Sequence, residues 1–336
     1  MISEQTLEQL WNVHLKKLNK EKWKAHNFIR NKFHKLKLHK ILFQLFESHF
    51  QACESDGSRV VVEKHLTRDS LQALIAENKV CAIHVPGFCP LDVAESLSKS
   101  ALEEYTQWKL GGVVDTDMFF AGGSIPREVA DHSWENFRRY FGEREDFIQK
   151  QRSMSGGTWP VDHLRLTLDE IWPFGACSGH YLGQKLRPAI MRIMHEKIDL
   201  NLSAPKHGFV HTDDFARLKP LHGTFSANVY LKIPEEGGEL YIWSVDLRKI
   251  KGIYSYLSAQ TLAMIMNQGN YVFNAEWQQK IFKLLPKPHI INPKPGDLVI
   301  LHSGRPHSVA PVTKGVRVTN QLFIDAKGNA PLTIRS

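Results

Sequence analysis

Short apolar runs divided by Gly, Pro and Asn follow one another from Leu186 to the end of the chain. This pattern restricts the fold more than any other feature, because short strands at regular spacing favour a sandwich or barrel. The stretch from Asp246 to about Leu285 breaks the pattern with apolar residues at helical spacing. It predicts helices inserted between two strands, as a lid or an interface. The expected strands cover residues 189–195, 208–213, 224–233, 238–244, 289–292, 297–302 and 316–324.

The first 185 residues are read mainly as helices and loops. Pairs of adjacent glycines occur at intervals within residues 109–188, and we expect loops there that could line a pocket. The expected regular elements are two amphipathic helices within residues 1–55, a helix over 67–78, a strand over 80–85, a helix from Pro90 to about Trp108 and a helix from Pro126 to about Lys150. The chain is therefore divided into three parts: residues 1–55, residues 56–185 flanking the strands, and residues 186–336 with an insertion at about 246–285.

The net charge of +8 is concentrated at the N-terminus, where residues 1–50 hold ten Lys or Arg against four Glu. Basic helices of this kind could bind an acidic partner, a membrane surface or RNA, but a charged helix face is most often a solvated face. We expect no nucleic-acid partner. The 336 residues, 42% of them apolar, are enough for a sizeable core, in a monomer or a homodimer.

The sequence shows no apolar run near the roughly 18 residues of a membrane span and no apolar signal segment at its start. We therefore expect a cytoplasmic protein without a membrane span. The four cysteines, Cys53, Cys81, Cys89 and Cys177, lack the CxxC spacing of a zinc or redox site. They are interpreted as reduced thiols in the core.

The strongest candidate for chemistry is His211-Thr212-Asp213, because residues i and i+2 of an extended segment point to the same face. One imidazole and one carboxylate supply two of the three ligands of a 2-His-1-carboxylate facial triad, the set typical of non-haem Fe(II) oxygenases. The third ligand is sought among the later histidines, His222, His289, His302 and His307. His307 is favoured because it follows a buried-looking strand and a turn, and His302 at the end of that strand is its rival.

Two polar residues follow His307 at a short distance. Arg317 lies ten residues later and Thr319 two residues beyond it, so on a strand both side chains point the same way. A guanidinium fork and a hydroxyl together can hold one carboxylate.

In combination these motifs resemble the 2-oxoglutarate- and Fe(II)-dependent oxygenases. The resemblance covers residues 186–326 as motifs and residues 67–108 more loosely. The His-x-Asp pair alone is a weak signal. The signal becomes specific when the distal His and then the Arg follow this pair in the expected order. The motifs are His211-Thr212-Asp213, Gly237-Gly238-Glu239-Leu240, Pro295-Gly296-Asp297, His307-Ser308-Val309-Ala310-Pro311-Val312 and Gly315-Val316-Arg317-Val318-Thr319.

The resemblance implies an α+β protein whose core is a double-stranded β-helix, the jelly-roll barrel, with Fe(II) at its mouth. The ligands implied are His211, Asp213 and His307, while Arg317 would pair with the distal carboxylate of 2-oxoglutarate. Thr319 stands where one branch of the family has a serine. Further cofactor-binding residues implied are Tyr230, which matches a tyrosine of the prolyl-hydroxylase-like members, and Asn228 on the same strand face.

The activity implied is hydroxylation of an unactivated C–H bond by O2, with 2-oxoglutarate converted to succinate and CO2. Asp213 occupies the position that Gly or Ala takes in the related halogenases, which favours oxygenation over halide transfer. A small molecule, an amino acid or natural-product intermediate, is the expected substrate. Desaturation or oxidative cyclisation stays open, as do a cupin-type enzyme without 2-oxoglutarate and a non-catalytic jelly-roll binding module that works through its basic N-terminal helices.

Overall fold

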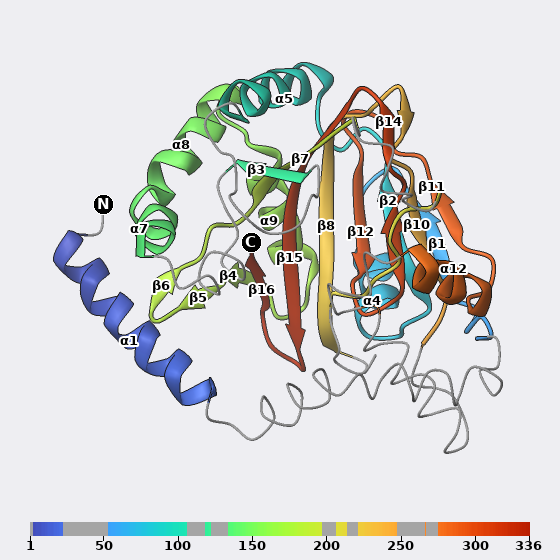
Figure 1. Cartoon of the computed structure of the whole chain (residues 1–336), viewed down its shortest axis with the longest axis horizontal. Helices are drawn as coiled ribbons and strands as arrows, with labels where there is room; N and C mark the ends of the chain where they lie inside the picture. Colours follow the sequence, from blue (N-terminus) through green and yellow to red (C-terminus); the bar gives the residue numbers. More distant parts are fainter. Residues whose placement is uncertain are drawn as a thin grey trace.

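The computed structural model describes residues 3–22, 53–105, 118–121, 134–196, 206–213, 221–246, 266 and 275–336. A large mixed sheet runs through the middle of this structure, with most helices on one side and the three-stranded sheet β11-β10-β13 on the other (Figure 1). The protein is therefore α+β, as expected. The helices are α1 (Glu4–Lys22), α4 (Arg68–Ile75), α5 (Leu91–Tyr105), α7 (Trp134–Gly142), α8 (Arg144–Met154), α9 (Pro160–Ile171) and α12 (Ala275–Leu284).

The large sheet has nine strands in the described part of the chain. Its order is β1-β2-β12-β8-β15-β16-β4, and β7 and β3 branch from β15. The central strands β8 and β15 are antiparallel neighbours (Figure 1). The bounds are β1 (Arg59–Val62), β2 (Val80–Val85), β3 (Met118–Ala121), β4 (Ala176–Ser178), β7 (Ile190–His195), β8 (His222–Lys232), β12 (Leu298–His302), β15 (Val316–Lys327) and β16 (Leu332–Arg335).

Smaller sheets complete the β-structure. Three strands, in the order β11-β10-β13, lie against one face of the large sheet. Leu240, Ile242 and Ile291 of the small sheet share a buried apolar cluster with Tyr230 and Val299 of the large one. The bounds are β5 (His180–Tyr181), β6 (Gln184–Lys185), β9 (Glu236–Gly237), β10 (Leu240–Ile242), β11 (His289–Ile291), β13 (His307–Val309) and β14 (Val312–Lys314), where β5 pairs with β6 and β9 with β14.

The two faces of the large sheet carry different residues, because successive side chains along each strand point to opposite faces. On β8, the alternate residues Phe225, Ala227 and Val229 enter the main hydrophobic core, which the helices cover. The residues between them, such as Asn228 and Tyr230, face the small sheet. The helix side of the sheet therefore supplies the main core, and the other side combines a smaller apolar cluster with polar groups.

The helices α4 and α9 begin at residues suited to that position. Thr67 caps α4, because its hydroxyl accepts a hydrogen bond from the Ser70 N–H at 3.2 Å. Pro160 opens α9, where its missing N–H costs no intrahelical hydrogen bond. Leu71 and Leu164 are fully buried members of the same core. The apolar face of each helix is thus turned toward the sheet.

The turn before β12 explains the Pro-Gly-Asp motif. The Asp297 carboxylate accepts hydrogen bonds from the backbone N–H groups of Gly87 at 2.9 Å and Lys294 at 2.8 Å, and lies 2.7 Å from His84 Nε2. Gly296 has φ +91°, and a β-carbon there would meet the Cys89 carbonyl oxygen at 2.5 Å. The motif therefore joins β12 to the turn after β2.

The helix α1 packs against α7 at the edge of the fold. Leu7 is buried with Phe137 and Phe141, and His14 Nδ1 lies 2.7 Å from the Tyr181 hydroxyl. This helix carries four Lys and three Glu, so its positive and negative charges are almost equal in number. The second expected basic helix, and six of the ten basic residues, fall within residues 23–50, outside the described residues.

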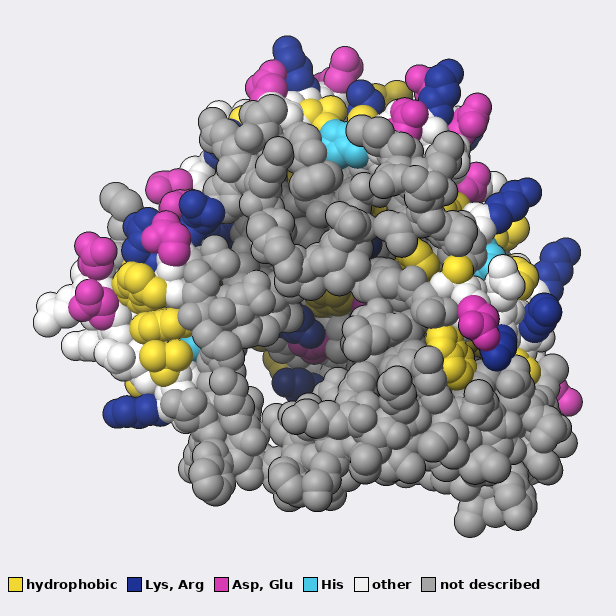
Figure 2. Space-filling model, in the orientation of Figure 1, with side chains coloured by type: hydrophobic (Ala, Val, Ile, Leu, Met, Phe, Trp, Pro, Cys, Tyr) yellow, Lys and Arg dark blue, Asp and Glu magenta, His cyan; other side chains and the backbone are white. Residues whose placement is uncertain are grey.

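Basic and acidic side chains lie side by side along the upper rim of the molecule, over α5 and the neighbouring strands (Figure 2). Mixed surface charge of this kind is typical of a solvated face. None of the helices in the described part of the chain is long and apolar enough to cross a lipid bilayer.

Several expectations about the elements were wrong in detail. The single helix expected from Pro126 to Lys150 is two helices, α7 and α8, separated by a turn at Glu143, and residues 122–133 lie outside the described residues. The helix α9 and the strands β1 and β16 were not expected. Of the inserted helices, α12 is described and residues 247–265 are not.

Three of the four cysteines are buried, as expected for core thiols, but Cys177 on β4 is exposed. Burial raises the pKa of the Cys53 thiol to about 11, which keeps it protonated at neutral pH. The main core contains residues from both sides of position 185, from Leu66 to Ile334. The three-part division of the chain stays a prediction.

Candidate metal centre

The structure brings His211, Asp213 and His307 together from two parts of the chain. His211 forms a single antiparallel bridge to His307, and each backbone N–H donates to the other's carbonyl oxygen at 2.9 Å. The Asp213 N–H donates to the Ser303 carbonyl at 2.9 Å. One ligand atom from each of the three side chains lies within 4.8 Å of the others. The expected strand at 208–213 is thus reduced to one bridge, which nevertheless places the triad.

The hydrogen bonds of the two imidazoles indicate how they are oriented. His211 Nδ1 lies 2.9 Å from the Phe209 carbonyl oxygen, and His307 Nδ1 lies 2.8 Å from the Arg305 carbonyl oxygen. A carbonyl oxygen can only accept, so each Nδ1 carries the hydrogen and each Nε2 keeps its lone pair. The Nε2 atoms lie 3.7 and 3.4 Å from the two Asp213 carboxylate oxygens. Carbonyl partners of this kind are what orient metal-binding histidines.

The protonation states also suit a metal. Burial and the neighbouring His307 lower the pKa of His211 to about 4, so its imidazole is neutral at physiological pH. Burial alone would raise the pKa of Asp213, but His307, His211 and Arg192 outweigh it and hold that pKa well below its usual range. Neutral imidazole and ionised carboxylate are the forms that bind a divalent cation.

The rival ligand His302 lies in a different environment. Its ring is buried against Phe225 at a centroid distance of 4.6 Å. The Gly304 N–H donates to His302 Nδ1 at 3.1 Å, so Nδ1 is the acceptor and Nε2 carries the hydrogen in the neutral ring. This tautomer is the reverse of that in the triad. His302 is accordingly a core histidine that fixes the turn before β13.

An ion pair holds the loop that carries His307. Arg305 is fully buried, and its Nη1 lies 2.6 Å from an Asp56 carboxylate oxygen, while Nη2 donates to the Asn78 carbonyl at 3.1 Å. Burial would raise the pKa of Asp56, but Arg305 and Ser58 lower it below its usual value. Removing either charge would leave the other buried without a partner.

Two further contacts hold the segment that carries His211. Gly208 has φ +75°, and a β-carbon there would collide with the Val309 carbonyl oxygen of β13. On the other side, α12 supplies the fully buried Gln278, whose Oε1 accepts from the Val210 N–H at 2.8 Å and whose Nε2 donates to the Val210 carbonyl at 3.1 Å. A side-chain amide therefore takes the place of a neighbouring strand beside His211.

Replacing Gln278 with methionine, which keeps the size and removes both hydrogen bonds, is expected to weaken metal binding about 10- to 100-fold. The free energy of unfolding should fall by about 2–3 kcal/mol, since two buried backbone groups lose their partner. Metal titration and urea denaturation measure the two effects. Lys283→Met on the same helix is the control, and equal metal affinity in Gln278→Met would show that the clamp does not position His211.

The residues expected to bind a carboxylate lie on β15 and β8. Arg317 Nη2 donates to the Tyr230 hydroxyl at 3.2 Å, and its guanidinium lies 4.9 Å from the centre of that ring. Thr319 pairs with Tyr230 across the two strands. Asn228, two residues before Tyr230, donates to the Ser226 hydroxyl at 3.1 Å and stands opposite Gln321. All four predicted residues thus share the face turned toward the small sheet.

Several polar atoms on this face are buried without a hydrogen-bond partner among the described residues. Arg317 Nε and Thr319 Oγ1 are two of them, and both side chains are almost completely buried. A buried donor without a partner costs about 1–3 kcal/mol, so such atoms indicate a place for a ligand. Together with the Tyr230 hydroxyl they form a set of donors suited to one carboxylate.

Arg192 and Gln278 were not identified from the sequence. Arg192 interrupts the apolar run of residues 189–194, and a charged residue within a buried strand was a signal that could have found it. No pattern distinguishes Gln278 from the other polar residues of α12, because its role depends on a contact with a segment 68 residues away.

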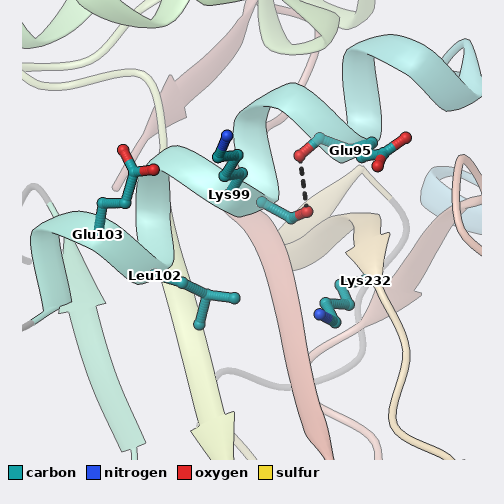
Figure 3. Close-up of a pocket in the computed structure, with 6 residues that line it drawn as sticks. Glu95, Lys99, Leu102, Glu103 and Lys232 are labelled. Atoms are coloured by element: carbon teal, nitrogen blue, oxygen red, sulfur yellow. Dashed lines mark hydrogen bonds between the residues drawn. The ribbon is translucent and has the colours of Figure 1, made fainter.

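A separate hollow of about 390 Å³ lies beside α5, on the helix side of the large sheet (Figure 3). Within α5, the Ser98 hydroxyl donates a hydrogen bond to the Glu95 carbonyl oxygen at 2.9 Å (dashed line in Figure 3). None of the predicted site residues lines it. The lining residues are Glu95, Ser98, Lys99, Leu102, Glu103 and Lys232.

Acid should destabilise the metal-free protein through His302. Burial, and then the Arg305 charge, lower the pKa of His302 to about 3, compared with about 6.5 when the chain is unfolded. The unfolded state therefore binds more protons between these values, and stability falls as pH falls through that window. Wild type is expected to lose up to about 1.4 kcal/mol per pH unit more than His302→Gln between pH 6 and 4. Urea denaturation with a chelator measures this, and equal slopes would contradict it.

Several solved structures are similar to this chain. An N-substituted L-amino acid dioxygenase from Burkholderia ambifaria AMMD is similar with a TM-score of 0.46 and 12% identity, over 80% of this chain and 91% of that one. A prolyl-4-hydroxylase from Pseudomonas putida has a TM-score of 0.33 and 16% identity, over 80% and 95%. The chain resembles 2-oxoglutarate- and Fe(II)-dependent oxygenases.

HygX from Streptomyces hygroscopicus, with nickel and 2-oxoglutarate bound, is a further similar structure, with a TM-score of 0.38 and 14% identity over 79% of this chain and 89% of that one. No protein-family model and no curated protein matches the chain. At these TM-scores and identities, the likeness to the oxygenases indicates neither a substrate nor a reaction. The residues of the site carry the functional conclusion.

Proposed function

We propose that the chain is an Fe(II)- and 2-oxoglutarate-dependent oxygenase that hydroxylates a small molecule. The observation that carries this proposal is that two candidate sites face each other across the interior between the large sheet and the small sheet. A cluster of His211, Asp213 and His307 can hold a divalent cation. A buried guanidinium, Arg317, with a tyrosine hydroxyl beside it, can hold a carboxylate.

The strand order supports a double-stranded β-helix as the core. In the large sheet β7, β15, β8 and β12 are neighbours, and all three pairs are antiparallel. Facing them, the segment at His211 pairs with β13, then β10, then β11. Along the chain these strands alternate between two facing sheets, except that β10 and β11 follow each other in the small sheet, and this order supports a jelly roll. The proposed metal ligands lie on the small sheet side, opposite Tyr230 and Arg317 on the large sheet.

The donor set fits Fe(II). Two imidazole nitrogens with free lone pairs and one ionised carboxylate are the facial triad, which leaves coordination positions open for other ligands. Bound Fe(II) with 2-oxoglutarate would supply the electrons that activate O2, the oxidant, for attack on a C–H bond. The Phe209 and Arg305 carbonyls keep each Nε2 directed at the ion by holding the Nδ1 hydrogen.

The remaining residues fit the distal carboxylate of 2-oxoglutarate. Arg317 offers Nε and its outer nitrogens in a planar fork, Thr319 offers a hydroxyl, and Tyr230 holds the guanidinium in place. Because these side chains are buried, a carboxylate bound there is shielded from water, which strengthens each charged hydrogen bond. Asn228 and Gln321 both donate to the Ser226 hydroxyl and support the floor of this region.

A small-molecule library with Fe(II), 2-oxoglutarate and ¹⁸O-labelled O2 tests the reaction type. Hydroxylation is expected, so a product should gain one labelled oxygen atom while succinate forms in equal amount. Loss of two hydrogens without labelled oxygen would instead assign desaturation or cyclisation. Asp213→Ala is the control and should give neither product. Label in the product that does not depend on 2-oxoglutarate would contradict the proposed co-substrate.

A further inference from the structure

A methionine thioether contacts the guanidinium that is proposed to bind 2-oxoglutarate. Met194 of β7 pairs with Arg317 of β15 across the two antiparallel strands. Arg317 Nη1 donates a hydrogen bond to Met194 Sδ at 3.1 Å, and Nη2 donates to the Tyr230 hydroxyl at 3.2 Å. The two outer nitrogens of Arg317 are therefore held by one sulfur atom and one phenol oxygen.

Strand alternation explains why this methionine faces the interior. Met191 and Ile193 enter the main core on the helix side of the large sheet. Successive side chains of a strand point to opposite faces, so Met194 lies on the face that carries Arg317. Met191 is fully buried, whereas Met194 is half-buried. Of these two methionines, Met194 is therefore the one that a small molecule in solvent can reach.

Oxidation changes the hydrogen-bonding character of such a side chain. A thioether is a weak hydrogen-bond acceptor. When it meets hydrogen peroxide, the sulfur lone pair attacks one peroxide oxygen, the O–O bond breaks and an S–O bond forms. The sulfur is oxidised by two electrons, and the leaving hydroxide takes the hydrogen of the transferred oxygen and becomes water. The product, methionine sulfoxide, is polar and carries an oxygen that accepts hydrogen bonds.

At position 194 the new oxygen would stand beside the Arg317 guanidinium. Arg317, Tyr230 and Thr319 are almost completely buried, so the space that they share has little room for an added atom. A carboxylate would have to displace the sulfoxide oxygen from Arg317 or share the guanidinium with it. Either arrangement weakens carboxylate binding, because a charge-assisted hydrogen bond is lost or lengthened.

We propose that Met194 is an oxidation site that controls co-substrate binding, with a peroxide as the oxidant. This inference rests on the proposed function, since it assigns the distal carboxylate of 2-oxoglutarate to Arg317. The reduced thioether leaves Arg317 available to the carboxylate, and the sulfoxide occupies it. Enzymes reduce methionine sulfoxide back to methionine, so the change is reversible.

Titration of 2-oxoglutarate before and after oxidation tests the inference. The metal-free full chain is treated with hydrogen peroxide in the presence of a chelator, and mass spectrometry of its peptides locates each added oxygen. A thiol reductant then reverses cysteine oxidation and leaves the sulfoxide in place. The chain is loaded with Zn²⁺, and calorimetry gives the dissociation constant of 2-oxoglutarate. The affinity should fall about tenfold and return after treatment with methionine sulfoxide reductase.

Three variants assign the effect to one methionine. Met194→Leu lacks the sulfur, so peroxide should change its affinity for 2-oxoglutarate by less than about twofold. Met194→Gln places a carbonyl oxygen near the position of the sulfoxide oxygen, so its affinity should be low before oxidation. Met154→Leu, at a partly buried methionine that packs against the main core, should respond to peroxide like the wild type. Thermal unfolding shows whether each variant is folded.

The failure of this inference can be told from the failure of the proposed function. If untreated wild type does not bind 2-oxoglutarate, the proposed function is wrong. If it binds but Met194 gains no oxygen, or Met194 is oxidised and the affinity does not change, the role of Met194 is wrong. An equal loss of affinity in oxidised Met194→Leu would also overturn that role.

Discussion

Replacing His307 with alanine is expected to remove metal binding and turnover together. The other two ligands, His211 and Asp213, leave a site with one imidazole and one carboxylate, which holds a divalent cation only weakly. Affinity for Mn²⁺, used as a stable substitute for Fe(II), should fall at least about 100-fold. Succinate formation should fall by about 1,000-fold or more, because chemistry requires the bound metal. Equilibrium dialysis and a succinate assay measure the two losses.

The matched control is His302→Gln. His302 lies five residues before His307, ends the preceding strand and is just as deeply buried. Its Nδ1 accepts a hydrogen bond from the Gly304 N–H and its ring packs at a tilt against Phe225, so it should contribute to stability without binding metal. We expect His302→Gln to keep its Mn²⁺ affinity within about threefold of wild type. The reverse result, with metal lost in His302→Gln and retained in His307→Ala, would exchange the two roles.

Replacing Arg317 with alanine is expected to weaken 2-oxoglutarate binding about 100-fold or more. The change removes a buried, charge-assisted fork and leaves the distal carboxylate beside neutral hydroxyls. Metal affinity should be nearly unchanged, because Arg317 is not among the metal-binding group. Calorimetric titration of 2-oxoglutarate into the Zn²⁺-loaded chain gives the dissociation constant, and Mn²⁺ dialysis gives the metal affinity.

Two related variants separate the contributions of the Arg317 guanidinium and its neighbour to 2-oxoglutarate affinity. Arg317→Lys keeps the charge without the planar geometry and should lose about tenfold. Tyr230→Phe removes the hydroxyl that accepts from Arg317 Nη2 and should lose less, about three- to tenfold. Wild-type affinity for 2-oxoglutarate in Arg317→Ala would show that the co-substrate lies elsewhere.

The strands of the core were predictable because their signal is local. The expected runs at 189–195 and 297–302 correspond to β7 and β12 within a residue. Alternation along β8 separates core residues from Tyr230, and the spacing of Arg317 and Thr319 places both on one face of β15. The order of the motifs then predicted which distant residues would meet.

The parts that sequence missed depend on contacts across the fold. The break at Glu143 between α7 and α8 lies where α7 packs on α1, with Phe137 and Phe141 buried beside Leu7. The segment before His211 is not a regular strand, because Gln278 of α12 bonds Val210 where a strand would. Local propensity carries no information about either contact.

The inserted stretch shows the same limit. Its apolar spacing predicted a helix, and α12 lies there, but a lid or an interface was the expected role. The described contacts show that α12 also supports the chain behind His211, with Gln278 bonded to Val210 and the Phe282 ring stacked on the His207 ring at a centroid distance of 3.8 Å. The role as a lid or an interface stays a prediction. A helix can therefore position a site residue by bonding to the backbone of the neighbouring segment. No residue pattern reveals such a contact.

Conversion of 2-oxoglutarate to succinate by the purified full chain tests the central claim most directly. With Fe(II), ascorbate and O2 present, succinate should form slowly without a primary substrate and faster with one. It should stop when Fe(II) is chelated, when O2 is removed, or when Asp213 is replaced with alanine. Succinate formation that is absent in wild type with Fe(II) bound, or that persists unchanged in Asp213→Ala, would contradict the assignment of the site.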